Sequence, residues 1–275
     1  MIPIRTIAQR PKALSQTGGK LQTRLHRYNR LCEHANKFIM MPSSFADTHY
    51  RVQTFLPSAS KFGFFLDATR FVNSFAAPTP ARPRPPTVLR NAVYLWGITL
   101  SQDPQYTARE SVFLGRTLRS VHAALSTAQE QQRNALYILQ AEILLTYYFF
   151  HSDRPLEGKF HASAAVSLAI MCNLHKVMSG NGRAGGQLFQ PAGQAYLPPP
   201  IDHIDEAERI FAWWAVFILD RSWAVALSSP TMINETQEPS TVIDTPWPLT
   251  VDKYAQVSCC SSSLRLFQFF YQASY

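Results

Sequence analysis

Residues 205–230 place the strongest constraint on how this chain folds. Ten apolar residues follow one another without a break from Ile210 to Leu219. Asp220 and Arg221 interrupt the run, and apolar residues resume from Trp223 to Leu227. A helix that is apolar all round has no face for water. This segment must therefore be enclosed, either by lipid or by other parts of the protein.

A lipid bilayer is the less favourable enclosure. The eight Val, Ile, Leu and Phe residues between Ile210 and Leu227 favour insertion by roughly 2–5 kcal/mol. Asp220 and Arg221 near the middle of the segment oppose it by roughly 2.5–3.5 kcal/mol each, about 5–7 kcal/mol together. We therefore expect no membrane contact and predict the central helix of a soluble helical domain.

The charged doublet requires partners from other helices. Successive residues of a helix point about 100° apart, so Asp220 and Arg221 cannot easily pair with each other, and an unpaired buried charge costs several kcal/mol. Glu142 is the one acidic residue within the apolar stretch 135–150, and we expect it to pair with Arg221. Asp220 is expected to accept from a backbone amide, a tryptophan N–H or an arginine. An effector-binding role for the doublet is the alternative.

The composition indicates a helical core with stiff connectors. A chain of 275 residues with 46% apolar content is long enough for one large domain or two small ones. Nineteen prolines outnumber eleven glycines, and no segment shows the sustained period-two alternation of a strand. The sequence therefore predicts an all-α, multi-helix domain of bundle-like or orthogonal packing, with long Pro- and Gly-rich loops at 78–86 and 179–203.

Apolar periodicity predicts where the helices lie. Pro57 is expected to stop the first of them. Four alanines at Ala162, Ala164, Ala165 and Ala169 are expected to let a neighbouring helix approach closely. The predicted helices cover residues 45–56, 62–75, 86–96, 106–127, 129–150, 158–177 and 204–227.

The positive charge of the chain gathers in its first 37 residues. The formal net charge is +8, and residues 1–37 hold eight basic residues against one acidic residue, whereas the remaining 238 residues hold 18 basic and 17 acidic ones. Only this arm can follow an anionic partner such as nucleic acid. Arg24, Arg27 and Arg30 are the candidates for contact with DNA phosphates, in a salt-sensitive and sequence-independent manner.

The arm also carries a short amphipathic helix. Apolar residues spaced 4, 3, 4, 3, 4 from Leu21 to Ile39 form the seam of a coiled coil or of a packed helix. An autonomous coiled coil needs about 3–4 heptads, so docking on the domain is favoured and a homodimer is the alternative. The Arg-rich composition also fits a mitochondrial transit peptide, but Pro3, Pro11 and Gly18–Gly19 break the helix that such peptides form.

No residue pattern predicts catalysis or metal binding. The four cysteines, Cys32, Cys172, Cys259 and Cys260, suggest reduced intracellular thiols rather than a disulfide framework. Residues 180–185 match G-x-G-x-x-G in spacing alone, since a helix and not a strand precedes them. The eight histidines show no metal-ligand spacing, and no nucleophile elbow or phosphate loop occurs. We expect this chain to be no enzyme and to hold no cofactor or metal.

The central helix also carries a family pattern, made of Glu206–Arg209, the pair Trp213–Trp214, the run Phe217–Arg221 and Pro230. This pattern resembles the all-helical regulatory domain of fungal-specific transcription factors. Further stretches resemble other parts of that domain, in its basidiomycete-type members and in the right order: Leu56–Leu66, Leu89–Leu100, Phe160–Lys176 and Ile243–Pro248. In this reading Trp213, Trp214, Asp220 and Arg221, with Glu142 as a partner, are structural motif residues.

The resemblance implies a domain organisation and a role. It divides the chain into a basic arm at 1–44, the regulatory domain at 45–250 and an atypical tail at 251–275 that suggests a truncated product. It implies a transcriptional regulator of the nucleus that contacts co-regulators. His161 and His175 fall in a family-like helix and are expected to be capping or core-edge residues rather than ligands.

The sequence departs from the family in one respect. Family members read DNA through six cysteines that hold two zinc ions near the N-terminus, whereas residues 1–44 contain only Cys32. Zinc and base-specific DNA contact are therefore expected only in an N-terminal module of the full-length parent that is missing from this chain. The alternative function is a helical scaffold or small-molecule-sensing module that binds no DNA.

Overall fold

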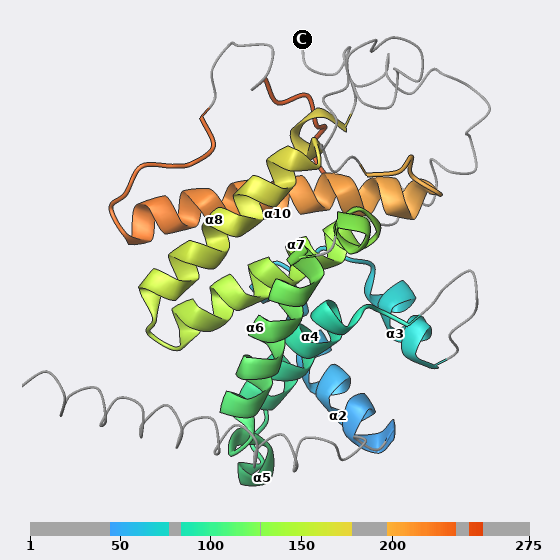
Figure 1. The fold of residues 1–275 in the computed structure, drawn as a ribbon, viewed down its shortest axis with the longest axis vertical. Coiled ribbons are helices and arrows are strands. Elements are labelled where there is room, and N and C mark those ends of the chain that lie inside the picture. The colour runs from blue at the N-terminus through green and yellow to red at the C-terminus, as the bar shows by residue number, and fades with distance from the viewer. Residues whose placement is uncertain (1–44, 77–83, 127, 178–196, 235–241, 250–275) are drawn as a thin grey trace, which may run out of the picture. The chain divides into compact units, whose positions relative to one another are not determined.

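The fold is built from helices (Figure 1). The chain divides into two compact units, Met1–Ala46 and Asp47–Tyr275, and nearly all of the structure described below belongs to the second. Within the described residues every regular element is a helix and no strand occurs, so the predicted all-α class is confirmed. The computed structural model describes residues 45–76, 84–126, 128–177, 197–234 and 242–249. The predicted amphipathic helix of the arm and most of the two Pro- and Gly-rich loops lie outside these ranges.

The chain enters the domain through two consecutive helices. α2 (Phe45–Phe55) continues directly into the 3-10 helix η1 (Leu56–Phe62). The α-helix ends at Phe55, ahead of Pro57 as predicted. Pro57 then stands in the first turn of η1, where its missing N–H is not needed. Gly63 ends η1 in the left-handed conformation, with φ +66°. A Cβ at Gly63 would lie 3.0 Å from Ile143 Cγ2, so this turn also requires a residue without a side chain.

The next part of the chain begins each helix at a capping residue. α3 (Ala68–Ala76) starts after Asp67, whose carboxylate accepts from the Arg70 amide at 2.6 Å. α4 (Thr87–Thr99) starts directly after Pro86. The single helix predicted at 106–127 is divided into α5 (Pro104–Thr107) and α6 (Glu110–Ser126). Asp103 caps α5, accepting from the Gln105 amide at 2.8 Å, so helical structure begins ahead of the apolar periodicity.

α7 (Ala128–His151) is the central element of the fold. It contacts α4, α6, α8, α10 and η1, and Figure 1 shows it between the α4–α6 pair and the α8–α10 pair. The indole Nε1 of Trp96 in α4 donates to the Leu144 carbonyl oxygen of α7 at 2.9 Å, and Phe62 stacks on Trp96 at 3.7 Å between ring centroids. Because partners surround it, α7 is buried over residues 138–146.

α8 (Pro155–Met171) and α10 (His203–Ala226) pack together on α7. α8 ends at Met171 rather than at 177, since Asn173 takes a left-handed conformation before the 3-10 turn η2 (Leu174–Lys176). Three of the four predicted alanines, Ala162, Ala165 and Ala169, are buried on the face of α8 toward its neighbours, together with Gly158, His161 and Val166, whereas Ala164 is only partly buried. Trp223 of α10 lies so close to Gly158 that a Cβ there would be 2.6 Å from the indole.

A helix that crosses a bilayer must be both long and predominantly apolar. Across the described ranges, none of the helices reaches the combination of length and apolar character needed to cross a bilayer.

We predict that Gly97→Ala destabilises the domain. A Cβ at Gly97 in α4 would collide with the backbone carbonyl of Arg51 in α2, and overpacking of this kind costs about 1–3 kcal/mol. Gly115→Ala in α6 is the matched control, since the nearest atom to its Cβ would be Arg119 Nη1 at 3.5 Å and alanine favours the helix by up to about 1 kcal/mol. Urea unfolding followed by circular dichroism measures both; equal stabilities of the two variants would contradict the close approach.

Candidate functional site: helix α10 and its buried polar partners

The N-terminus of α10 is fixed by a capping carboxylate. Asp202 accepts from the Asp205 amide at 2.9 Å, which satisfies one of the free amides of the first turn. Asp205 and Glu206 add negative charge in that turn, where the helix dipole favours it. Partial burial opposes ionisation of Asp202, but hydrogen bonds from the Asp205 amide and from Arg70 lower its pKa below the ordinary value.

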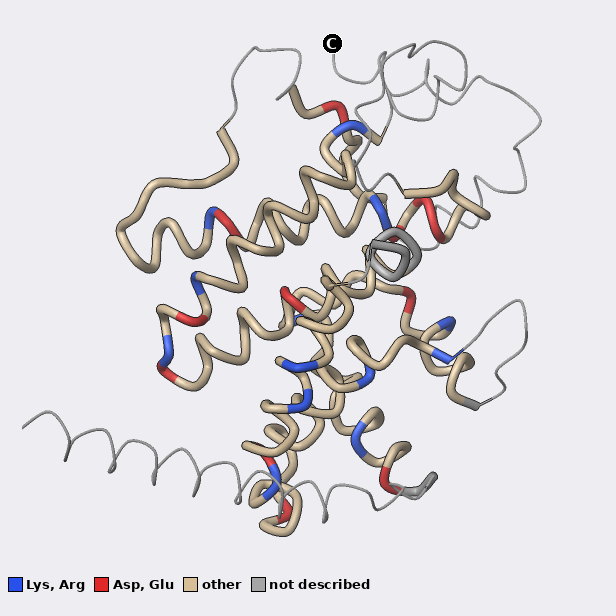
Figure 2. Tube along the Cα trace, in the orientation of Figure 1, with Lys and Arg blue, Asp and Glu red and all other residues tan. Residues whose placement is uncertain are grey.

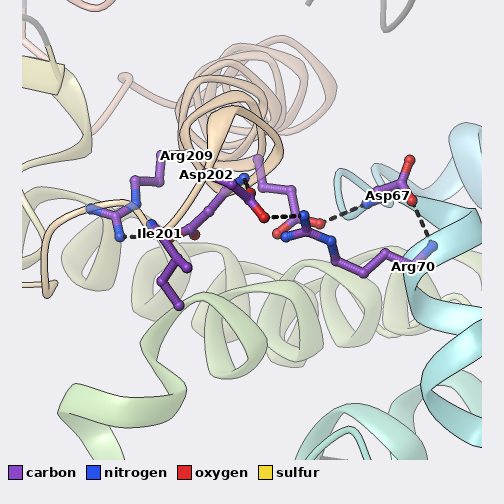
Figure 3. A network of polar contacts seen from close by, with 7 residues as sticks. Asp67, Arg70, Ile201, Asp202 and Arg209 are labelled. Carbon is purple, nitrogen blue, oxygen red and sulfur yellow. Dashed lines mark hydrogen bonds and ion pairs between the residues drawn. The ribbon is translucent and has the colours of Figure 1, made fainter. Parts of the chain in front are cut away.

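The same end of α10 is joined to the start of α3 by a polar network (Figure 3). Arg70 of α3 pairs with Asp202 at 2.6 Å, and the Asp67 amide donates to Glu208 Oε1 at 2.9 Å. Asp67 in turn accepts from the Arg70 amide. The capping residues of α3 and α10, which lie far apart in the sequence, are therefore joined to each other by polar contacts.

A second set of contacts fixes the chain that leads into α10. Arg209 donates to the Pro198 carbonyl at 2.7 Å and to Asp205 at 3.1 Å. The Ile201 amide donates to the same Asp205 carboxylate at 3.0 Å. Residues 198–202 are thereby held against the first two turns of the helix.

Glu208 is the most perturbed acid of this network. It is buried, and burial raises the pKa of its carboxyl to about 7, against the Asp67 amide and Arg70, which favour the charged form. Asp205 and Asp67 add to the rise because they are negatively charged. A carboxyl with this pKa changes its charge near neutral pH.

The tryptophan pair in the middle of α10 has two separate tasks. Trp213 is buried in the core and packs against the His175 ring at 5.7 Å. Trp214 donates its Nε1–H to the Pro246 carbonyl at 2.7 Å, and its indole stacks on Trp247 with 3.9 Å between ring centroids. The segment at 243–248 that the sequence singled out is therefore attached to α10 through Trp214.

Asp220 fixes the chain that follows α10. Its carboxylate is buried and accepts from the Met232 amide at 3.0 Å and from the Ile233 amide at 3.0 Å. The prediction that Asp220 accepts from a backbone amide is thus confirmed. Arg221 donates to the Ile233 carbonyl at 3.2 Å, and its guanidinium lies 4.8 Å from the centroid of the Phe217 ring.

The predicted ion pair between Arg221 and Glu142 is wrong. Glu142 is directed toward α8, where its Oε2 lies 2.6 Å from His161 Nδ1, and both side chains are buried. Phe149 stacks on the His161 ring with 5.2 Å between centroids. The sequence prediction paired Glu142 with an arginine, whereas α8, the helix next to α7 in the chain, supplied a histidine. His161 and His175 both occupy core positions.

Arg51 is a buried cation that sequence reasoning missed. It is 2% exposed, lies 3.6 Å from Asp47, and stands 4.8 Å from the Phe113 ring and 5.6 Å from the Tyr94 ring. Burial lowers the pKa of its guanidinium from the ordinary value. Among the described residues no acceptor reaches its Nε or Nη1. No sequence signal marked Arg51, because a lone arginine in an amphipathic helix ordinarily faces water.

The remaining predicted features fall into three groups. Arg24, Arg27 and Arg30 lie outside the described residues, so their contact with DNA phosphates stays a prediction. Cys172 is a buried free thiol, and burial raises its pKa to about 11. In the part of the chain that the structure describes, no three His, Cys, Asp or Glu side chains come together in a way that could hold a metal ion.

These contacts define an all-helical domain whose central helix is α7. The prediction that the segment of α10 is central and fully enclosed is wrong, because α10 packs on α7 and α8 from one side and leaves Ile218 57% and Val225 82% exposed. A family model described as "Fungal specific transcription factor domain" matches residues 43–254. The chain therefore belongs to this family, as the sequence motifs indicated. No curated protein and no solved structure gave a significant match.

We predict that Glu208 makes the domain less stable as the pH rises. The folded pKa of about 7 exceeds the ordinary value of 4.5, so the folded state binds more protons between these pH values. Linkage then lowers the free energy of unfolding by about 3 kcal/mol from pH 4.5 to pH 7, with no further loss above. Glu208→Gln keeps an acceptor for the Asp67 amide and removes this titration. Denaturant unfolding at several pH values gives the free energy of unfolding of the wild type and of the variant. The wild-type value minus the variant value should fall between pH 4.5 and pH 7, and a difference that does not change with pH contradicts the prediction.

We also predict unequal roles for the two members of the charged doublet. Asp220→Ala leaves the buried Ile233 amide without its acceptor, which costs about 2–3 kcal/mol of stability. Arg221→Ala removes a partly exposed donor and is expected to cost about 1 kcal/mol. Thermal unfolding of both variants gives the comparison, and a larger loss for Arg221→Ala would refute the assignment of Asp220 as the anchor.

Proposed function

We propose that this chain regulates transcription in the nucleus, as the regulatory part of a fungal transcription factor. The observation that carries the proposal is the family match over residues 43–254, which spans nearly all of the described fold. The family is one of transcription regulation and not an enzyme family. In this role the domain acts through contacts with transcriptional co-regulators rather than through catalysis.

In a full-length parent, DNA recognition is divided between a zinc-cluster module and the basic arm of this chain. A zinc-cluster module reads the bases there, and its zinc ions belong to that module, since this sequence holds only four cysteines. Arg24, Arg27 and Arg30 of the basic arm add contacts to phosphates, which contribute affinity but no sequence preference.

Exposed apolar side chains support a role in protein contacts. Leu156 is 84% exposed, Val225 is 82% exposed and Trp247 is 74% exposed. Charged residues make up only 16% of the chain. Exposed apolar side chains mark a site for other polypeptides where they adjoin one another, as Leu156 and the 69% exposed Phe160 do one turn apart on α8.

The experiment is a reporter assay with the full chain fused to a heterologous DNA-binding domain in a fungal host. We expect the fusion to change transcription several-fold relative to the DNA-binding domain alone, and Gly97→Ala to reduce that change while Gly115→Ala leaves it intact. Immunoblots check that the fusions are present in equal amounts. A reporter level equal to that of the DNA-binding domain alone would favour the scaffold or small-molecule-sensing alternative.

A further inference from the structure

α8 is apolar on two opposite faces. Its packed face is made mainly of small buried residues. Its outer face carries large apolar side chains that remain in water: Leu156 is 84% exposed, Phe160 is 69% exposed, Ile170 is 43% exposed and Met171 is 46% exposed. Ser163 and Ser167 are the polar residues of this outer row. A helix with so narrow a polar face favours a second packing partner, and the structure supplies only the first among the residues that it describes. We name the outer row, residues 156, 160, 163, 167, 170 and 171, the α8 stripe.

The α8 stripe is self-complementary. Residues 156, 160, 163, 167 and 170 follow the 4, 3, 4, 3 spacing of a helix-packing seam, and Met171 lies one turn beyond Ser167. Large residues lie near the ends of the stripe, and the small Ser163 and Ser167 lie between them. If a second α8 runs antiparallel about an axis between Ser163 and Ala164, Phe160 lies opposite Ser167 and Leu156 lies opposite Met171. Large side chains then face small ones near the axis, and apolar side chains face each other at the ends.

The charge distribution permits this pairing. From Phe160 to Met171 the sequence contains no Asp, Glu, Lys or Arg, and Figure 2 shows α8 without charged residues beyond its first turns. A two-fold axis through a charged segment would bring like charges together at a cost. No such repulsion opposes the pairing of this helix with its own copy.

We propose that the chain forms a homodimer through the α8 stripes of two copies, packed antiparallel. Side chains of this size bury at most about 200 Å² each, so at the observed exposures the four large residues supply roughly half of the ~800 Å² per partner of a stable interface. The dimer is therefore expected to dissociate in the micromolar range. The proposal does not depend on the transcriptional role.

The test is sedimentation velocity of the full chain between about 1 and 100 µM. The wild type should shift from monomer to dimer over this range, and Phe160→Glu should weaken the dimer at least tenfold, because it places a charge at the centre of the contact. Ile201→Glu is the matched control, since Ile201 is 90% exposed and lies outside the stripe. Circular dichroism checks that both variants keep their helices.

A second variant tests the antiparallel register. In Phe160→Glu/Ser167→Lys each glutamate would face a lysine of the other copy, so the double variant should regain dimerisation and lose it again in high salt. A wild-type chain that stays monomeric at 100 µM overturns the proposal and assigns the stripe to residues 251–275 or to another protein. A dimer that Phe160→Glu does not weaken also overturns it.

Discussion

An aspartate buried in the last two turns of a largely apolar helix is the constraint on which the rest of this structure depends. Apolar neighbours alone cannot enclose such a helix, because an ionised carboxylate without donors is far more costly than the apolar burial it accompanies. The chain turns back after α10, where Ser228 takes a left-handed conformation. This turn brings the Met232 and Ile233 amides within hydrogen-bond distance of Asp220. The end of the helix and the path of the following segment are thus set by one side chain.

The same arrangement recurs along the length of α10. Glu208 near its start accepts from the beginning of α3, Trp214 in its middle donates to Pro246, and Asp220 near its end accepts from residues 232–233. Each of these polar groups on α10 binds a different segment of the chain, while the apolar residues of α10 contact α7 and α8. Packing therefore holds the helices together, and the hydrogen bonds determine which irregular segments lie against them.

The sequence was sufficient for the parts of the fold that depend on pattern. The long apolar helices at α7, α8 and α10 and the all-α class follow from periodicity. The cost of a buried charge predicted that Asp220 needs a donor but left a backbone amide, a tryptophan N–H and an arginine open, and the structure supplies backbone amides. The partners of Glu142 and Arg221 did not follow, because the choice among nearby groups depends on how α7 is rotated about its axis, which periodicity leaves open when a helix is buried on many sides. The start of α5 was missed because the Asp103 cap precedes the apolar pattern. Arg51 gave no signal at all, since its burial results from three aromatic rings contributed by other helices.

The polar ties of α10 have a consequence for synthesis of the protein on the ribosome. Asp67 and Glu208 are 141 residues apart, and translation proceeds at about 5–20 residues per second. The start of α3 therefore waits on the order of 10 s before the start of α10, to which it is joined, has been made. During this interval the nascent chain exposes Trp- and Phe-rich surfaces that belong to the core. Chaperones that recognise apolar segments are thus expected to act on this domain as it emerges, and to release it only once α10 is complete.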